Sequence, residues 1–116
     1  MNRLLIAIAA IMVIVSAQSA VALDTVGKKL YADNCMRCHG DNGQGAVGKR
    51  LAGDAAYWDF AIFKRAVMTG IDDEDRHLKI MPVWGRTGLD KPKGKIPTDE
   101  QLQDIQAYLK TFGPPE

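Results

Sequence analysis

Apolar residues recur at helical spacing in three separate segments of this chain. The first segment follows Asp24 or Thr25, either of which can cap a helix, and the second segment follows Asp54. Thr98 precedes the third segment and forms with Gln101 the pattern of a capping box. The apolar positions of the three segments are, in order, Val26, Leu30 and Tyr31; Trp58, Ile62, Phe63, Ala66 and Val67; and Leu102, Ile105, Tyr108, Leu109 and Phe112. No strand-like alternation separates them, so the predicted fold class is all-α.

Glycine is expected to end the helices and to form the longest loop. Gly70 is the expected end of the second helix, and the Gly113-Pro114 pair is the expected end of the third. The stretch from Gly40 to Gly53 is rich in glycine and is therefore predicted to be a loop. Its apolar residues Val47 and Leu51 are expected to turn inward.

The N-terminal segment has the features of an export signal. Arg3 precedes an unbroken run of 12 apolar residues from Leu4 to Val15, and Ala20-Val21-Ala22 has the form of a signal peptidase site. An uncleaved membrane anchor is the alternative, but this run is shorter than the roughly 20 residues that a spanning helix needs. We therefore expect residues 1–22 to be a signal peptide cleaved after Ala22. The mature domain would comprise residues 23–116 and lie in the periplasm, with no stable membrane insertion after cleavage.

Charge and cysteine content exclude several classes of protein. The 116 residues carry a net charge of +1, and removal of residues 1–22 takes away Arg3 alone, leaving 14 basic and 14 acidic side chains. This balance argues against nucleic acid or an anionic membrane as a partner. Two cysteines are too few for a scaffold of several disulfides. A domain this small usually supplements its core with a metal, a cofactor or disulfides.

The two cysteines belong to one short motif, Cys35-Met36-Arg37-Cys38-His39, which has the spacing of an attachment site for c-type haem. Two thiols three positions apart near a helix end can each add to one vinyl group of a porphyrin, and the adjacent imidazole can then reach the iron. A redox-active dithiol would instead follow a strand, and this motif follows a helical segment and precedes Gly40, Gly43 and Gly45. A zinc site would need four ligands, and His77 is the only further Cys or His. The sequence therefore predicts one covalently attached haem c.

Over nearly all of residues 24–112, these features resemble a class I cytochrome c. The attachment motif is the most specific of them. The weaker matches follow in the right order: the Gly40–Gly45 loop, Leu51-Ala52-Gly53, Met81-Pro82, and Ala107-Tyr108-Leu109 in the last helix. The resemblance implies a small cytochrome c fold, with about three main helices wrapped around one haem, and an electron carrier that is not an enzyme.

The resemblance also implies that the first and last helices cross near one end of the haem. The small residues Gly27 and Ala107 would allow the close approach at this crossing. Tyr31 and Tyr108 are expected to pack alongside as core residues.

Two axial iron ligands are predicted, His39 from the attachment motif and Met81 on the opposite side of the ring. Met81 lies in an irregular segment, and the proline after it biases the backbone towards an extended form that can present the side chain inward. Met36 lies between the attachment cysteines, and Met68 lies in an amphipathic helix where core packing is expected. His77 is the alternative sixth ligand, although its polar neighbours favour a solvated loop.

One position departs from the family pattern. Many members have a proline just before the leucine that corresponds to Leu51, and its carbonyl accepts the second imidazole proton of the proximal histidine. Lys49-Arg50 occupies that place here, so a backbone carbonyl near Lys49 is expected to orient His39. Trp58 and Trp84 are candidates for a hydrogen bond to a haem propionate, and core packing is the alternative role for Trp58.

The expected function is the transfer of single electrons between redox proteins, with an exported dehydrogenase or a terminal oxidase as partner. Docking is expected at the exposed haem edge. The candidate rim residues are Met36, Val47, Ile80, Pro82 and Val83. The acidic run of residues 72–75 and the basic run of Lys91, Lys93 and Lys95 are expected to be solvated loops that could orient the carrier. The alternative function is a haem-based sensor or catalyst with an exchangeable sixth ligand, for which the sequence identifies no distal hydrogen-bond donor.

Overall fold

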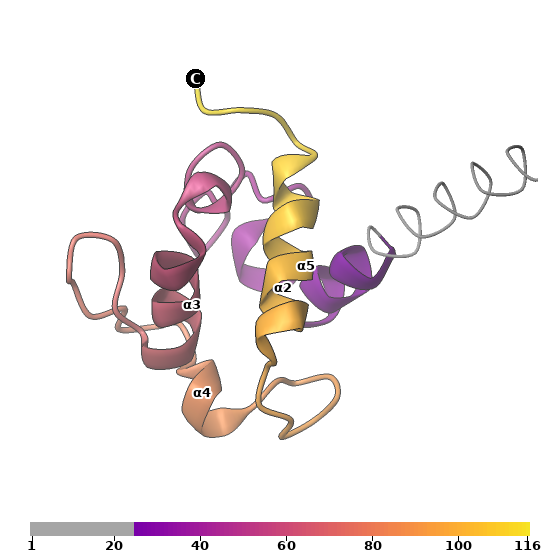
Figure 1. The fold of residues 1–116 in the computed structure, drawn as a ribbon, viewed down its shortest axis with the longest axis vertical. Helices are drawn as coiled ribbons and strands as arrows, with labels where there is room; N and C mark the ends of the chain where they lie inside the picture. The colour runs from indigo at the N-terminus through magenta and orange to yellow at the C-terminus, as the bar shows by residue number, and fades with distance from the viewer. Residues whose placement is uncertain (1–24) are drawn as a thin grey trace, which may run out of the picture.

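A computed structural model describes residues 25–116. The predicted signal peptide and its cleavage site lie outside this range. Residues 25–34 are helical, and they are followed by α2 (Met36–His39), the 3-10 helix η1 (Ala55–Tyr57), α3 (Phe60–Thr69), α4 (Trp84–Thr87) and α5 (Asp99–Lys110) (Figure 1). Within residues 25–116 the one β pairing is an isolated bridge between Ile71 and His77, so the predicted all-α class is confirmed. No helix in the same range is long and apolar enough to cross a membrane.

The helix of residues 25–34 leads directly into the attachment motif. The N–H of Cys35 donates to the Tyr31 carbonyl at 2.8 Å, and the N–H of His39 donates to the Cys35 carbonyl at 3.0 Å. Cys35 therefore continues the helical turn and is the N-cap of α2. The first helix buries Leu30 and Tyr31, as its apolar spacing predicted.

Gly27 is where the first helix crosses α5 (Figure 1). A β-carbon at Gly27 would lie far inside contact distance of the Asp104 backbone carbonyl and 3.1 Å from the β-carbon of Tyr108. The rings of Tyr31 and Tyr108 pack together with their centroids 5.7 Å apart. The predicted contribution of Ala107 is wrong: this residue is exposed. Asp104 and Tyr108 lie one turn apart on the face that meets Gly27, and Ala107 lies farther round the helix, away from the core.

The second predicted helix begins later than expected. Asp54 precedes only the short η1, and Trp58 then adopts an extended conformation (φ −64°, ψ 154°) that interrupts the helix. The Trp58 indole N–H donates to the Asp54 carboxylate at 3.2 Å. The α3 helix starts after Asp59 and ends at Gly70, whose left-handed φ of 74° confirms the predicted stop.

The α5 helix has the predicted capping box. The Thr98 hydroxyl accepts from the Gln101 N–H at 3.1 Å, and the Gln101 side chain accepts from the Thr98 N–H at 3.0 Å. The inward face of the helix buries Leu102, Ile105 and Leu109. Burial of each such side chain contributes about 1.5–3 kcal/mol before the entropy of ordering is subtracted. Because α5 packs against both η1 and α3, and α3 packs against α4, the core lies around this helix.

Two residues predicted for the apolar stripes are not core residues. Val26 is 46% exposed and Phe112 is 36% exposed. Phe112 lies beyond the last residue of α5, where the helix no longer directs it inward. Its ring packs edge-on against Tyr108, with the centroids 5.1 Å apart.

Candidate functional site

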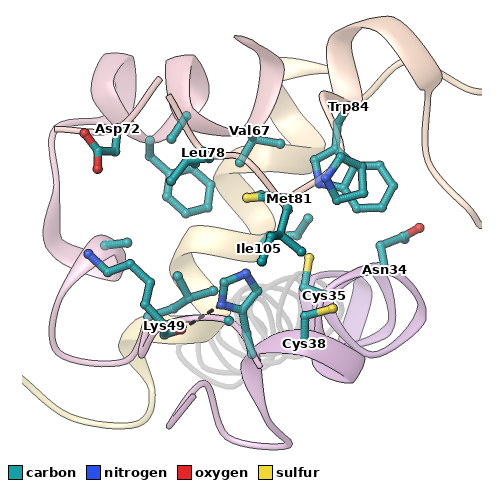
Figure 2. Close-up of a pocket in the computed structure, with 18 of the residues that line it drawn as sticks. Asn34, Cys35, Cys38, Lys49, Val67, Asp72, Leu78, Met81, Trp84 and Ile105 are labelled. Atoms are coloured by element: carbon teal, nitrogen blue, oxygen red, sulfur yellow. Dashed lines mark hydrogen bonds between the residues drawn. The ribbon is translucent and has the colours of Figure 1, made fainter. Parts of the chain in front are cut away.

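A cavity of about 370 Å³ lies between α2, α3, α5 and the segment of residues 78–84 (Figure 2). Its volume lies within the range of cofactor and small-molecule sites, about 300–1,000 Å³. Most of the side chains that line it are apolar. They include Leu51, Ala55, Phe63, Ala66, Val67, Leu78, Leu89, Leu102, Ile105 and Leu109. Such a lining excludes water from a group bound inside.

Cys35 and Cys38 are free thiols, and both line the cavity. Figure 2 shows their sulfur atoms near each other at one side of it. Burial, together with the nearby Cys38, raises the pKa of the Cys35 thiol to about 12. Such a shift favours the protonated thiol, so Cys35 is not the activated thiolate that a dithiol oxidoreductase uses.

His39 is buried at the end of α2, and the loop that follows fixes its orientation. Its Nδ1 lies 2.7 Å from the Lys49 carbonyl oxygen, the contact drawn as a dashed line in Figure 2. A carbonyl oxygen only accepts hydrogen bonds, so Nδ1 is the donor, and in the neutral ring this tautomer leaves the lone pair on Nε2. The sequence predicted a carbonyl near Lys49, and the structure identifies it as that of Lys49 itself. The bond leaves Nε2 available to a metal.

The loop of residues 45–49 is held against the end of α2 by its backbone. The N–H of Gly45 donates to the His39 carbonyl at 2.8 Å, and the N–H of Gly48 donates to the Cys38 carbonyl at 2.6 Å. A β-carbon at Gly48 would lie 2.8 Å from Cε1 and 2.9 Å from Nδ1 of His39, closer than real β-carbons approach. Gly48 is therefore needed for the loop to reach the imidazole. Gly48 could not be singled out from the sequence, because nothing in a glycine-rich loop distinguishes one glycine from the others.

Met81 lines the cavity from the irregular segment between α3 and α4, as predicted. Figure 2 shows its sulfur atom pointing into the cavity. The short α4 helix, which the sequence analysis did not predict, follows directly. A β-carbon at Gly85 would clash with the backbone of Met68, so α4 packs closely on α3 and anchors the segment that carries Met81.

The other candidate ligands lie outside the cavity. His77 is exposed, and its backbone forms the bridge with Ile71. Met68 packs against the core from α3, which is its predicted role, and Met36 is also packed against the core. Within residues 25–116, one histidine and one methionine line the cavity, and these are His39 and Met81.

The two tryptophans line the cavity in different ways. Trp58 is partly exposed, and its indole N–H is already bonded to Asp54. Trp84 is buried at the start of α4, and Figure 2 places it on the same side of the cavity as Met81. Trp84 is therefore the better placed of the two to donate its indole N–H to a group inside the cavity.

Asp72 departs from the solvated loop predicted for the acidic run. It is 3% exposed, and its carboxylate accepts from the N–H groups of Glu74 and Arg76 and from the Arg76 guanidinium, each at 2.9 Å. These bonds, with the Arg76 N–H contributing most, hold the pKa of Asp72 below its usual range. Glu74 and Asp75 are paired with Arg76 and Arg65. Three of the four carboxylates in the run are therefore held by Arg65 or Arg76.

The predicted rim and the basic run are both exposed in large part. Val47 and Ile80 line the cavity while being 79% and 83% exposed, and Pro82 is an exposed lining residue as well. Met36 and Val83 do not line the cavity. The three lysines of the basic run are exposed, as expected of a solvated loop. They are Lys91, Lys93 and Lys95.

The donor set of the cavity fits a covalently attached porphyrin. It combines two free thiols, an imidazole with a free Nε2 and a thioether within an apolar lining. By contrast, no group of three or more His, Cys, Asp and Glu side chains within residues 25–116 could hold a metal ion, so the zinc alternative lacks ligands there. Fold and site together define a helical protein with covalently attached haem.

A comparison with protein families identifies this class. The sequence profile of the cytochrome c family matches residues 25–113, and the chain belongs to that family. It therefore carries covalently bound c-type haem and transfers electrons.

The chain is also similar to the cbb3-type cytochrome c oxidase subunit CcoP of Azospirillum sp. (strain B510). The two are 31% identical over 86 residues, which cover 72% of this chain and 28% of the relative. The chain thus spans less than a third of that subunit's length. No solved structure matches the chain.

Proposed function

We propose that this cytochrome is an exported monohaem electron carrier whose haem iron is held by His39 and Met81. The observation that carries the proposal is the hydrogen bond from Nδ1 of His39 to the Lys49 carbonyl, because it frees Nε2 for the iron. The position of Met81 supports the second ligand, since its sulfur points into the same cavity. The exposed position of His77 argues for Met81 over this alternative.

In this proposal each residue of the site has a separate task. Cys35 and Cys38 hold the haem through thioether bonds. The bound haem supplies an iron that changes between the ferric and ferrous states without bonding a substrate. The Lys49 carbonyl orients the His39 ring and makes its Nε2 a stronger donor. The Met81 thioether favours ferrous iron and so raises the reduction potential.

The rest of the cavity keeps water away. Trp84, Leu102 and Leu109 are each no more than 4% exposed, and all three line it. In an apolar surrounding the extra positive charge of ferric iron is less stable, which raises the potential further. The chain's contribution is therefore to hold two ligands and a dry cavity in place through both redox states.

The proposal includes a redox protein as partner, such as a terminal oxidase or an exported dehydrogenase. The relative is named as a subunit of an oxidase, which supports a link to a terminal oxidase. The exposed apolar residues Val47 and Ile80 at the mouth of the cavity support docking there. Cleavage after Ala22 and a periplasmic location complete the proposal, and the N-terminal pattern of residues 1–22 supports both.

The test compares Met81→Leu with Met68→Leu, because both changes remove a sulfur atom and nearly preserve volume. Ferric wild-type protein should show the weak long-wavelength band of a sulfur-to-iron bond. Met81→Leu should lose this band and lower the reduction potential by at least about 60 mV, a tenfold change in the one-electron equilibrium. Met68→Leu should keep both properties, since Met68 packs in the core.

Carbon monoxide binding provides the opposing outcome. Reduced wild-type protein should not bind carbon monoxide at neutral pH, whereas reduced Met81→Leu should bind it at the freed position. A wild-type protein that binds carbon monoxide readily and lacks the sulfur band would contradict the proposal. It would favour a sensor or catalyst with an exchangeable sixth ligand.

A further inference from the structure

Asn34 is a buried polar residue directly before the first attachment cysteine. It is 8% exposed and lines the cavity (Figure 2). Its Oδ1 accepts from the N–H of Asp90 at 2.9 Å and from the N–H of Lys91 at 3.0 Å. Its Nδ2 donates to the carbonyls of Leu30 and Lys91, both at 3.0 Å. Four bonds use the whole capacity of one carboxamide, and three of them go to a segment far along the chain.

The loop of residues 88–95 that receives these bonds is closed on itself. The N–H of Leu89 donates to the Lys95 carbonyl at 2.8 Å, and the N–H of Gly94 donates back to the Leu89 carbonyl at 2.9 Å. Residues 90–96 are all exposed, so little besides Asn34 attaches the tip of this loop to the body. An ion pair between Arg37 and Asp90 spans 3.6 Å between exposed side chains and contributes little.

Leu89 connects this loop to the cavity. It is 4% exposed, lines the cavity and directly precedes the two residues whose N–H groups Asn34 binds. The position of Asp90 and Lys91 therefore determines how far Leu89 reaches into the wall. If the Asn34 bonds were lost, two N–H groups would lack their acceptor and would turn to water.

We propose that Asn34, directly before the attachment cysteines, is a positioning residue that holds Leu89 in the cavity wall and so keeps water from the haem. The proposal rests on the covalent haem of the family and on the cavity. It does not depend on Met81 as the sixth ligand. The proposal for Met81 as iron ligand and the proposal for Asn34 can therefore be contradicted separately.

The experiment measures two properties of the haem-loaded variants, hydrogen exchange at the Asp90 and Lys91 amides and the reduction potential. Asn34→Ala should speed exchange at these amides by about tenfold or more and should lower the potential, because water stabilises ferric iron. Asn34→Asp keeps the two acceptor bonds but turns an oxygen towards the Leu30 and Lys91 carbonyls, so exchange at these amides should be faster than in the wild type and slower than in Asn34→Ala. Asn42→Ala is the matched control, since Asn42 is exposed in the loop after His39, and it should change neither property.

Leu89→Ala separates the wall from the bonds that hold it. It should lower the potential as Asn34→Ala does, while the Asp90 and Lys91 amides keep their slow exchange. An Asn34→Ala protein with wild-type exchange, or with fast exchange and a wild-type potential, would overturn the proposal. If Asn34→Ala fails to accumulate with haem, a wild-type potential in Leu89→Ala would overturn it equally.

Discussion

The His39 imidazole lies between two backbone groups of one loop. The Lys49 carbonyl fixes its Nδ1, and the α-carbon of Gly48 lies against the ring with no room for a side chain. The backbone therefore sets both the tautomer and the tilt of the ring. A change at residue 48 should affect the iron even though that residue has no functional group.

Gly48→Ala should push the loop away from the imidazole and weaken the bond from Nδ1 to the Lys49 carbonyl. The forced contact should cost about 1–3 kcal/mol of unfolding free energy. The less basic imidazole should stabilise ferric iron less, so the reduction potential should rise. Voltammetry and the paramagnetically shifted NMR signals of the His39 ring measure the effect. Ala46→Gly, at an exposed position of the same loop, is the control, and equal behaviour of the two variants would exclude this role for Gly48.

At this scale the sequence predicts residues whose chemistry is local. Cys35, Cys38 and His39 form one contiguous motif, and the Met81-Pro82 pair has a recognisable backbone preference. Gly48 and Asn34 were missed because their roles come from residues brought close by folding. The fully bonded amide of Asn34 meets a loop more than 50 positions away, and no local pattern encodes that meeting.

The α5 helix is the element that organises the core, and its N-terminus is fixed by the Thr98 and Gln101 capping box. The helix packs against η1 and α3 and buries Leu102 and Leu109 almost completely. Loss of order in its first turn would therefore reach the residues that line the cavity, since Leu102 is one of them.

Thr98→Ala should lower the free energy of unfolding by about 1 kcal/mol, because the Gln101 N–H loses its acceptor. Thr111→Ala makes the same chemical change at the other end of α5, where the hydroxyl only donates to the Tyr108 carbonyl, and should cost less. Denaturant unfolding of both haem-loaded variants measures the difference. A larger loss for Thr111→Ala would show that the cap does not stabilise this helix.

Helix boundaries were predictable where one signal stood alone. Thr98 had no competitor, whereas both Asp54 and Asp59 precede apolar residues, and the chain uses only Asp59 for the longer helix. The α4 helix escaped prediction because it is four residues long and contains Gly85, which normally weakens a helix. Gly85 is tolerated because close packing on α3 requires a residue without a side chain.

Over the whole molecule, acidic and basic side chains are nearly equal in number, and arginines hold most of the acidic run of residues 72–75. Asp72, Glu74 and Asp75 are paired with Arg65 or Arg76, and residues 23–116 carry equal numbers of acidic and basic side chains. The exposed apolar residues at the cavity mouth, Val47 and Ile80, then become the feature that a redox partner would meet. If redox proteins meet at the cavity mouth, a charge placed there should change the rate of electron transfer.

Electron self-exchange between ferric and ferrous copies tests this without a known partner. Val47→Lys and Ile80→Lys each place a positive charge on both meeting surfaces, and repulsion should slow self-exchange on the order of tenfold. Val26→Lys and Ile96→Lys are the matched controls, because these residues are exposed but do not line the cavity. NMR line widths of mixed redox states give the rate. Equal slowing in the controls would mean that the mouth is not the contact surface.

The crossing at Gly27 also limits when the first helix can pack against α5. Gly27 lies against the backbone of Asp104, so the first helix finds its partner almost at the opposite end of the chain. A ribosome makes residue 27 long before residue 104, and Leu30 and Tyr31 have no α5 to cover them during that interval. The crossing can therefore form only after residue 104 is available, so the α5 cover over Leu30 and Tyr31 is completed late.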